Sequence, residues 1–315
     1  MKNLLAYLQL LRLPNLFTAM ADIFMGFLIS HGTFQPISEF CPLLAASSCM
    51  YLAGMVLNDW FDIEVDRSER PLRPLPSGRV PQSHALYGGI GLLTLGFVAA
   101  LFVHSTSRNV ALILIATVVL YDGFTKNTLV GPANMGICRG LNVLLGMSSV
   151  PGTIWLPISD DPVGRFGTMV AAGMLLYVMG VTRFARREAE AAPRLDVIST
   201  TLGFNLGLLL VAMSHKFLPE WAARLALPPS GSTTLSFNIA VAIWVSVVLA
   251  TNGMVLRALV GTEPLKVQQA VKTCILAIIG IDADVTALVC GPVWACVILA
   301  LLLPTVVLGR WVYST

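Results

Sequence analysis

The stretch Asn-Asp-Trp-Phe-Asp-Ile-Glu-Val-Asp-Arg, residues 58–67, directly follows an apolar run at residues 41–57. Four of these ten residues are acidic. If the helix of the apolar run continues, a rotation of about 100° per residue turns Glu64 away from the other acidic side chains. The side chains that then share one arc of the helix all carry oxygen ligands: Asn58, Asp59, Asp62 and Asp66.

The composition places this helix in a membrane. Of the 315 residues, 56% are hydrophobic and only 12% are charged, and the mean hydropathy is +0.78. Such a chain cannot cover itself with a polar surface. The net charge of +3, from 20 basic and 17 acidic residues, is too small to indicate nucleic acid. We therefore expect the lipid bilayer as a partner and no nucleic acid.

The carboxylates of residues 58–67 need compensation in this setting. An Asp left ionised at the bilayer centre costs roughly 2.5–3.5 kcal/mol, so three would cost about 10 kcal/mol. They must lie near water, in a polar cavity or on cations. A hard divalent cation relieves their repulsion and keeps positions open for a further anion, of which diphosphate is the obvious one. The alternative is a solvated helix end, which rarely sorts its carboxylates onto one side.

Ten apolar segments of spanning or near-spanning length follow one another, and a polar break at residues 282–284 separates the last two. They predict an all-α, multi-pass transmembrane bundle of nine to ten spans, in a single domain over residues 1–315. The segments lie at about 14–30, 41–57, 84–103, 109–121, 132–151, 166–182, 198–215, 236–256, 267–283 and 291–309.

Lys and Arg gather in alternate loops, among them the loops that hold Arg70, Lys126 and Arg187. The positive-inside rule makes this side cytoplasmic, so we expect a cytoplasmic N-terminus. Pro71 and Pro74 prevent the acidic helix from continuing. Residues 67–83 are therefore expected to form an arginine-rich cytoplasmic loop that caps the carboxylates.

Residues 121–126, Tyr-Asp-Gly-Phe-Thr-Lys, come at the cytoplasmic end of a span. Lys126 alone is explained by snorkelling. An ammonium and a phenol on the same membrane face as the carboxylates are, however, what a departing diphosphate needs. Tyr121 and Lys126 are therefore candidates for that role, and Asp122 adds a ligand or a base.

Arg139 and Asn142 stand inside an otherwise apolar segment and share a helix face. An intramembrane Arg is a functional candidate, because a lipid-facing one is expensive. A structural tie between helices explains the pair equally well.

Residues 182–190 form a third cytoplasmic cluster, in which Glu188 is turned away from the other polar side chains. The face opposite suits phosphate oxygens, because guanidinium groups bind them bidentately. Positive-inside charge is the alternative. This face carries Arg183, Arg186, Arg187 and Glu190.

Other chemistry has no support. The four His residues show no ligand spacing, and there is no Walker loop, Rossmann fingerprint or G-x-S-x-G elbow. Hydride transfer and ATP-driven pumping are therefore not indicated.

The pattern Asn58-Asp59-x-x-Asp62-x-x-x-Asp66 resembles the first aspartate-rich motif of the UbiA-type intramembrane prenyltransferases, and it follows the second predicted span as that motif does. Residues 11–14, Leu-Arg-Leu-Pro, are similar to the family's N-terminal segment, and Tyr121 with Lys126 resembles its tyrosine and lysine after the fourth span. The resemblance implies nine helices around a central cavity, Mg²⁺ bridging the carboxylates to an isoprenoid diphosphate, and prenyl transfer to an acceptor.

The chain departs from the family after the sixth span, where a second aspartate-rich motif is expected. Here arginines replace the paired aspartates, and only Glu188 falls where an acid is expected. Together with residues 131–140, Gly-Pro-Ala-Asn-Met-Gly-Ile-Cys-Arg-Gly, the pattern looks most like the EboC-type branch. That branch belongs to a bacterial secondary-metabolite operon, which implies a bacterial plasma membrane.

We therefore predict a Mg²⁺-dependent enzyme that transfers a prenyl group from an isoprenoid diphosphate to an aromatic or other small lipophilic acceptor. The predicted metal ligands are Asn58, Asp59, Asp62, Asp66 and Glu188. The predicted catalytic residues are Asp59, Asp62, Tyr121, Lys126 and Arg139. The predicted substrate-binding residues are Asn58, Asp122, Asn142, Arg183 and Arg187.

Two other functions stay open. A non-catalytic carrier or scaffold that binds a lipid diphosphate is motivated by the altered second motif. A secondary transporter rests only on the intramembrane charge, because the chain shows no inverted repeats.

Overall fold

The computed structural model describes residues 2–152, 161–186, 194–225, 234–260 and 264–312. Every regular element within them is helical, which confirms the predicted all-α class. The first half holds α1 (Lys2–Leu10), α2 (Leu13–His31), α3 (Ile37–Phe61), α4 (Ile63–Glu69), α5 (Gln82–Leu101), α6 (Ser105–Leu120), the π-helical turn η1 (Tyr121–Thr125) and α7 (Gly131–Met147). The second half holds α8 (Pro162–Ala185), α9 (Arg194–Ser214), the 3₁₀ turn η3 (His215–Phe217), α10 (Leu218–Arg224), α11 (Thr234–Val260), α12 (Pro264–Cys290), α13 (Pro292–Ala300) and α14 (Leu302–Val312).

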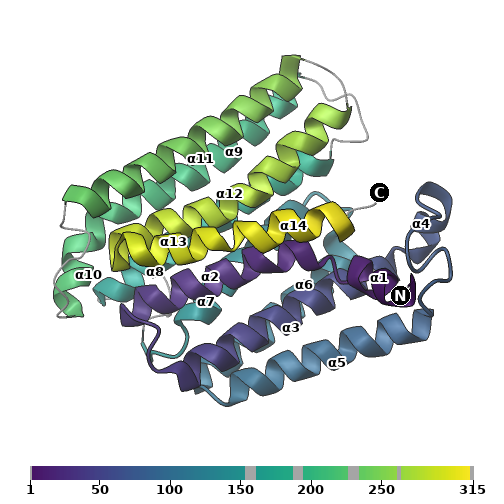
Figure 1. The fold of residues 1–315 in the computed structure, drawn as a ribbon, viewed down its shortest axis with the longest axis horizontal. Coiled ribbons are helices and arrows are strands. Elements are labelled where there is room, and N and C mark those ends of the chain that lie inside the picture. The colour runs from purple at the N-terminus through teal and green to yellow at the C-terminus, as the bar shows by residue number, and fades with distance from the viewer. Residues whose placement is uncertain (1, 153–160, 187–193, 226–233, 261–263, 313–315) are drawn as a thin grey trace.

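The described residues include nine helical segments that are long and apolar enough to cross a membrane. A further helix, α7, has 17 residues and packs against both α2 and α8. With α7 counted, the described residues hold ten helical segments that run along the bundle, and an even number returns the chain to the end at which it starts. Accordingly α14 contacts α1, and both lie at the end of the bundle where α4 is found (Figure 1). We call this the acidic end.

The predicted break at residues 282–284 is wrong. The helix α12 runs through Asp282 and Asp284 to Cys290, and both carboxyl side chains are fully buried inside the bundle. The helix ends instead at Gly291, whose φ is 89°, followed by Pro292. A left-handed glycine and a residue without an N–H interrupt the hydrogen-bond ladder, whereas an Asp-Ala-Asp segment does not.

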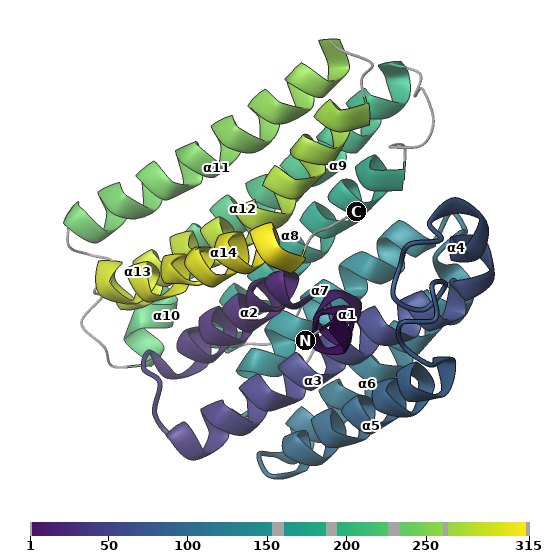
Figure 2. The ribbon, with the colours of Figure 1, turned by 45° about the vertical axis from the view of Figure 1, so that its right-hand side comes forward.

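Eight helices contact one another in a closed ring, in the order α2, α3, α6, α7, α8, α9, α11, α12 and back to α2. The helix α5 packs outside α3, and α13 and α14 pack outside α12 and α2 (Figures 1 and 2). Helices of this ring line the polar pocket and the apolar cavity of the candidate site.

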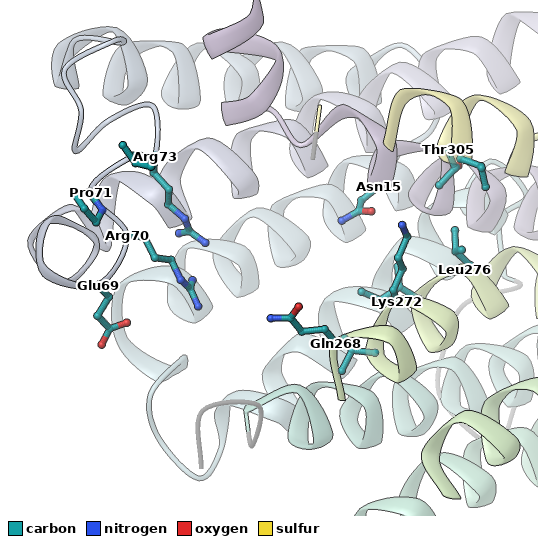
Figure 3. Close-up of a pocket in the computed structure, with 13 residues that line it drawn as sticks. Asn15, Glu69, Arg70, Pro71, Arg73, Gln268, Lys272, Leu276 and Thr305 are labelled. Atoms are coloured by element: carbon teal, nitrogen blue, oxygen red, sulfur yellow. The ribbon is translucent and has the colours of Figure 1, made fainter. Parts of the chain in front are cut away.

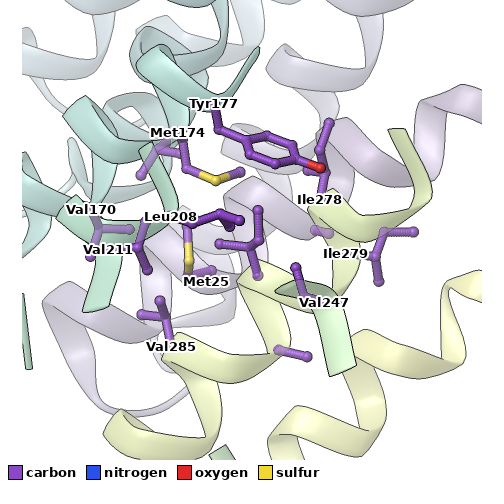
Figure 4. Packing of buried hydrophobic residues seen from close by; sticks show 14 of the residues in the cluster. Met25, Val170, Met174, Tyr177, Leu208, Val211, Val247, Ile278, Ile279 and Val285 are labelled. Carbon is purple, nitrogen blue, oxygen red and sulfur yellow. The ribbon is translucent and has the colours of Figure 1, made fainter. Parts of the chain in front are cut away.

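Two glycines bring α2 and α7 together across the ring, on the side away from the acidic end. Gly26 of α2 and Gly146 of α7 let the two backbones touch, since a Cβ at Gly26 would lie 2.5 Å from the Val143 carbonyl oxygen. Buried apolar side chains such as Met25, Met174 and Tyr177 fill the space between α2, α8, α9 and α12 (Figure 4). Open space is therefore left between this crossing and the acidic end.

Candidate active site

The predicted continuation of the acidic helix is confirmed. Across the junction of α3 and α4, the Asp62 N–H donates to the Asn58 carbonyl at 3.1 Å, and the Asp66 N–H donates to the Asp62 carbonyl at 2.8 Å. The helical rotation is kept, so Asp59 and Asp66 are buried while the Glu64 side chain is 76% exposed and pairs with Arg67 at 2.7 Å. The oxygen-bearing face points inward, as the periodicity predicts.

Basic side chains hold each of the inward carboxylates. Asp59 pairs with Arg12 at 2.5 Å, and Asp62 pairs with Lys126. We call this set the acidic-end cluster: Arg12, Asp59, Asp62, Asp66, Arg73 and Lys126.

Arg73 connects two of these carboxylates. Its guanidinium lies 2.7 Å from Asp66 and 3.6 Å from Asp59. Arg73 belongs to the proline-containing loop after α4, so the expectation that this loop caps the carboxylates is confirmed. The three basic residues supply the charge compensation that burial of the acids demands.

The turn η1 brings a further carboxylate to this cluster. Its wide hydrogen bond runs from the Lys126 N–H to the Tyr121 carbonyl at 3.0 Å. Asp122 is buried, and its Oδ1 accepts from the Asn58 amide at 3.1 Å. Its Oδ2 is buried without a hydrogen-bond partner among the described residues. The Oδ2 atom of Asp122 can therefore bind a cation or accept a hydrogen bond from a ligand.

A polar pocket of about 350 Å³ joins these groups. Asn58, Asp62, Asp122 and Lys126 line it together with Tyr121. Carboxylate and amide oxygens are the ligands of hard divalent cations, so the donor set fits such an ion. No three acidic, His or Cys side chains of the described residues are already gathered as a metal site. A cation would displace the basic partners from the carboxylates it binds.

An apolar cavity of about 380 Å³ continues inward from the polar pocket, and Arg12, Tyr121 and Thr182 line both. Its walls include Met50, Leu114, Val118, Val178 and Ile278, which come from four helices of the bundle, α3, α6, α8 and α12. Volumes of this order are typical of small-molecule sites. A ligand with a polar head and an apolar chain fits the two spaces together.

Arg139 contacts α2, on the wall of the apolar cavity. Its Nε lies 2.7 Å from the buried Asp22 carboxylate, and its terminal nitrogens donate to the Thr18 hydroxyl at 3.3 Å and the Thr18 carbonyl at 2.6 Å. Asn142 donates to the Ala19 carbonyl at 2.9 Å and to Asp22 at 2.8 Å.

Asn142 also accepts from Ser47 of α3 at 2.6 Å, so both N–H groups and the oxygen of its amide are used within the protein. These contacts correspond to a tie between α2, α3 and α7, which is the alternative that the sequence left open. We call Asp22, Arg139, Asn142 and Ser47 the intramembrane tie, and we leave Arg139 and Asn142 out of the proposed reaction.

Of the arginines after the predicted sixth span, the structure describes Arg183 and Arg186. Arg183 is exposed and lines neither the polar pocket nor the apolar cavity. Arg186 instead lines the polar pocket and donates to the Thr128 carbonyl at 2.6 Å. Arg186 passes so close to Gly131 that a Cβ there would collide with its guanidinium. Arg187 and Glu188 lie outside the described residues.

Three residues that matter here were missed as members of the site. Arg12 has left-handed backbone angles, φ 46° and ψ 45°, at the start of α2. The sequence indicated only its part in the topology and in the family resemblance of residues 11–14. Arg73 was seen only as part of a basic loop, and Asp22 was not singled out. Asp22 could have been found from the sequence, because it is the one acidic residue within the first apolar segment and ionisable residues are rare there.

A model described as the UbiA prenyltransferase family matches residues 19–262 of this chain. The digeranylgeranylglyceryl phosphate synthase of Sulfurisphaera tokodaii is 30% identical over 143 residues, which is 45% of this chain and 51% of that protein. The synthase of the same name from Saccharolobus solfataricus is 24% identical over 204 residues, 64% of this chain and 71% of that protein. The chain thus spans about half the length of the first relative.

Solved structures share the fold. A digeranylgeranylglyceryl phosphate synthase superposes with a TM-score of 0.61 at 21% identity, covering 92% of this chain and 99% of the other. A UbiA homologue from Archaeoglobus fulgidus, solved with DMAPP and Mg²⁺, gives a TM-score of 0.54 at 16% identity over 70% of this chain and 83% of the other. These two likenesses are of fold alone. The family match and the nine long apolar helical segments of the described residues together make the chain a multi-pass membrane protein.

Proposed function

Because the chain belongs to the UbiA prenyltransferase family, we propose that it transfers a prenyl group from an isoprenoid diphosphate to a lipophilic acceptor within the membrane. The observation that carries this proposal is the continuity of the polar pocket with the apolar cavity. One space has charged groups for a diphosphate, and the other has apolar walls for a chain. Residues 1–315 would act as a single transmembrane domain.

The reaction requires departure of the diphosphate. The allylic C–O bond breaks and its electron pair stays on the diphosphate, while the acceptor forms the new bond to the prenyl carbon and loses a proton. Lys126, Tyr121 and Arg186 line the polar pocket, where an ammonium, a phenol and a guanidinium can stabilise the developing negative charge. The apolar walls keep water away from an allylic cation.

We propose Mg²⁺ as the divalent ion, by analogy with the solved homologue that holds it. Asn58, Asp62 and Asp122 line the polar pocket and would hold it first. Asp59 and Asp66 would join once their arginine partners move to the diphosphate. Bound there, the ion supplies positive charge for the leaving group. Glu188 stays a prediction for a second metal.

We further propose a bacterial plasma membrane, a cytoplasmic acidic end and membership of the EboC-like branch. The arginine-rich loops around Arg70, Lys126 and Arg186 support the orientation. Single introduced cysteines in these loops should resist membrane-impermeant thiol reagents in intact cells and react in inverted vesicles. Labelling from outside in intact cells would reverse the orientation.

The activity is tested with purified protein in detergent, Mg²⁺, a panel of prenyl diphosphates and acceptors extracted from cells. Diphosphate release coupled to a prenylated product is the expected result. Tight binding of a prenyl diphosphate without release, whatever the acceptor, would instead identify a carrier. Absence of any binding would contradict both functions.

A further inference from the structure

The helix α12 carries polar side chains at two levels. Near the acidic end, Gln268 and Lys272 line a further pocket of about 710 Å³, which the start of α2, the loop after α4 and α14 complete (Figure 3). Asp282 lies about 15 Å further along the helix axis than Lys272. Asp282 and Asp284 line neither this pocket nor the two spaces of the candidate site, and both are fully buried within a span. Two acids with no access to a pocket need partners within the protein.

Asp282 has a single neighbour of this kind. Neither of its carboxyl oxygens has a hydrogen-bond donor among the described residues. Along α12 it lies between Ile279 and Val285, which belong to the buried apolar core (Figure 4). The described side chain within hydrogen-bonding reach of the Asp282 carboxyl group is the carboxyl group of Asp22 on α2. A contact between two acids therefore joins α2 to α12.

The two oxygens of Asp22 differ in their partners. Its Oδ2 lies 2.7 Å from the Arg139 Nε and accepts from the Asn142 amide at 2.8 Å. Its Oδ1 is buried and has no donor within the part of the chain that the structure describes. An ionised carboxylate can only accept hydrogen bonds, so two ionised acids would meet as acceptors with no donor between them. The contact between Asp22 and Asp282 becomes a hydrogen bond once one of them carries a proton.

The charges around Asp282 also require a proton. Two ionised acids would carry two negative charges, and the charged side chains that act on Asp282 within the described residues are Asp22 and Arg139. Arg139 compensates one negative charge only. The other would stay unmatched in a fully buried site, where an isolated charge is most costly.

The remaining elements packed on α12 do not supply this charge. On α8, Tyr177 is neutral as a donor, and its hydroxyl group bonds to the Cys274 carbonyl at 2.8 Å. His215 of η3 lies 3.8 Å from Asp284. Asp284 is two residues beyond Asp282, about 200° away around the helix, so His215 approaches α12 on a different side. The missing positive charge must therefore be a bound proton or a small cation.

We infer that Asp22 and Asp282 form a proton-binding site inside the bundle, in which the two carboxyl groups share one proton at neutral pH. The proton belongs to Asp282, which donates it to Asp22, because Arg139 and Asn142 already stabilise a negative charge on Asp22. The two acids and Arg139 are then neutral together. This inference does not depend on the proposed prenyl transfer.

The shared proton keeps one wall of the apolar cavity neutral. Arg139 lines that cavity, whereas Asp22 and Asp282 are fully buried and do not. An unmatched charge next to the cavity would draw in water, which an allylic cation in the proposed reaction must not meet. Asp282 is thus a positioning residue, which acts on Arg139 through Asp22.

Infrared difference spectroscopy tests the proton directly, on the full chain in mild detergent at neutral pH. The spectrum of the unaltered protein minus that of Asp282→Asn should contain one carboxylic-acid C=O band that shifts in D₂O. Asp284→Asn is the matched control, since it removes the other buried acid of α12 and should leave this band in place. Absence of the band from the first difference spectrum would mean that both carboxyl groups are ionised, and would overturn the inference.

Thermal unfolding tests which acid carries the proton. An Asn at position 282 can donate its amide to Asp22 as the acid does, so Asp282→Asn should shift the Tm by less than about 2 °C. Asp22→Asn removes the carboxylate nearest to Arg139 and should lower the Tm by at least about 6 °C. Both changes together leave Arg139 without a carboxylate and should lower it further. A larger loss for Asp282→Asn than for Asp22→Asn, or failure of Asp282→Asn to fold, would overturn the assignment.

A sodium ion carries the same single positive charge, so the test must distinguish it from a proton. Thr286, one turn beyond Asp282 on the same helix face, has a buried hydroxyl group without a partner among the described residues, and it offers a further oxygen. The Tm of the unaltered protein should be the same in sodium and in choline buffers. A lower Tm in choline that Asp282→Asn no longer shows, together with the absence of the acid band, would assign the site to sodium and overturn the shared proton.

Discussion

The acidic-end cluster and the intramembrane tie contain the same chemical groups in two different settings. In the first, Asp62 and Lys126 line a pocket, and both side chains stay partly exposed. In the second, Asp22 is fully buried and Arg139 nearly so, and backbone carbonyls and an amide complete their hydrogen bonds. Pairs of the first kind can exchange partners with a ligand, whereas pairs of the second kind hold helices together.

The difference shows that the behaviour of an ion pair in a membrane depends on the other groups that contact its two members. Removal of one member of a buried pair leaves an uncompensated charge, so such a pair resists change. At the acidic end a diphosphate or a cation can replace either member, because the pocket admits it. The following predictions separate these two behaviours, in order of decreasing effect.

Asp62→Ala should abolish Mg²⁺-dependent binding of geranyl diphosphate, because it removes an oxygen ligand from the polar pocket. Equilibrium binding to the purified protein, with Mg²⁺ titrated, measures this. Glu64→Ala is the matched control, since Glu64 belongs to the same helix and is 76% exposed on the opposite face. A comparable loss in both variants would contradict the inward metal face.

Arg139→Ala should lower the free energy of unfolding by about 3–5 kcal/mol, because Asp22 would remain buried and uncompensated. Denaturation in mild detergent measures it. Replacing Asp22 and Arg139 together with Leu should recover most of the loss. If Arg139→Ala folded with unchanged stability but did not turn over, Arg139 would return to the reaction.

Arg186→Ala should weaken the binding of geranyl diphosphate by roughly 1.5–3 kcal/mol, the scale of a hydrogen bond to a charged group. Arg186→Lys should restore only part of it, because Lys lacks the planar fork. Arg183→Ala, one turn earlier and exposed, should leave the dissociation constant unchanged. A loss on Arg183→Ala alone would favour the phosphate-binding role that the sequence predicts for Arg183.

Ser47→Ala should cost about 1 kcal/mol of stability, because it removes a neutral hydrogen bond to Asn142. The affinity for Mg²⁺ and geranyl diphosphate should not change. Ser246→Ala provides the control, since Ser246 is exposed on α11 and bonds only within its own helix. A change in diphosphate affinity would show that the intramembrane tie also positions the site.

Helical periodicity was sufficient to predict which side chains point inward where all of them belong to one helix. The inward face of residues 58–66 and the outward position of Glu64 follow from the rotation per residue, and the structure has both. The capping loop also followed, because prolines end a helix whatever surrounds it. These features depend on neighbours in the chain.

The sequence pattern did not predict contacts between residues that lie far apart in the chain. Asp22 and Arg139 are far apart in sequence, and only the crossing of α2 and α7 at Gly26 and Gly146 brings them together. The predicted break at residues 282–284 was wrong for the same reason. An Asp-Ala-Asp segment between two apolar runs suggests a solvated loop, and only the packing around α12 shows that both carboxyl groups are buried. Arg186 was passed over in favour of Arg183 because both belong to the basic face predicted for residues 182–190, and only the packing of α8 shows which of them lines the polar pocket.

The sequence by itself determined the membrane class, the order of the apolar segments, the acidic helix face and the family to which they belong, because hydropathy and helical periodicity are local properties. Only the tertiary structure decided which basic side chain holds each carboxylate, which residues of α2 Arg139 contacts, and that an apolar cavity adjoins the polar pocket. Pairing energies and cavity walls depend on which helices are neighbours in space. That choice is made by close packing at glycines and by burial, which no single segment of the chain contains.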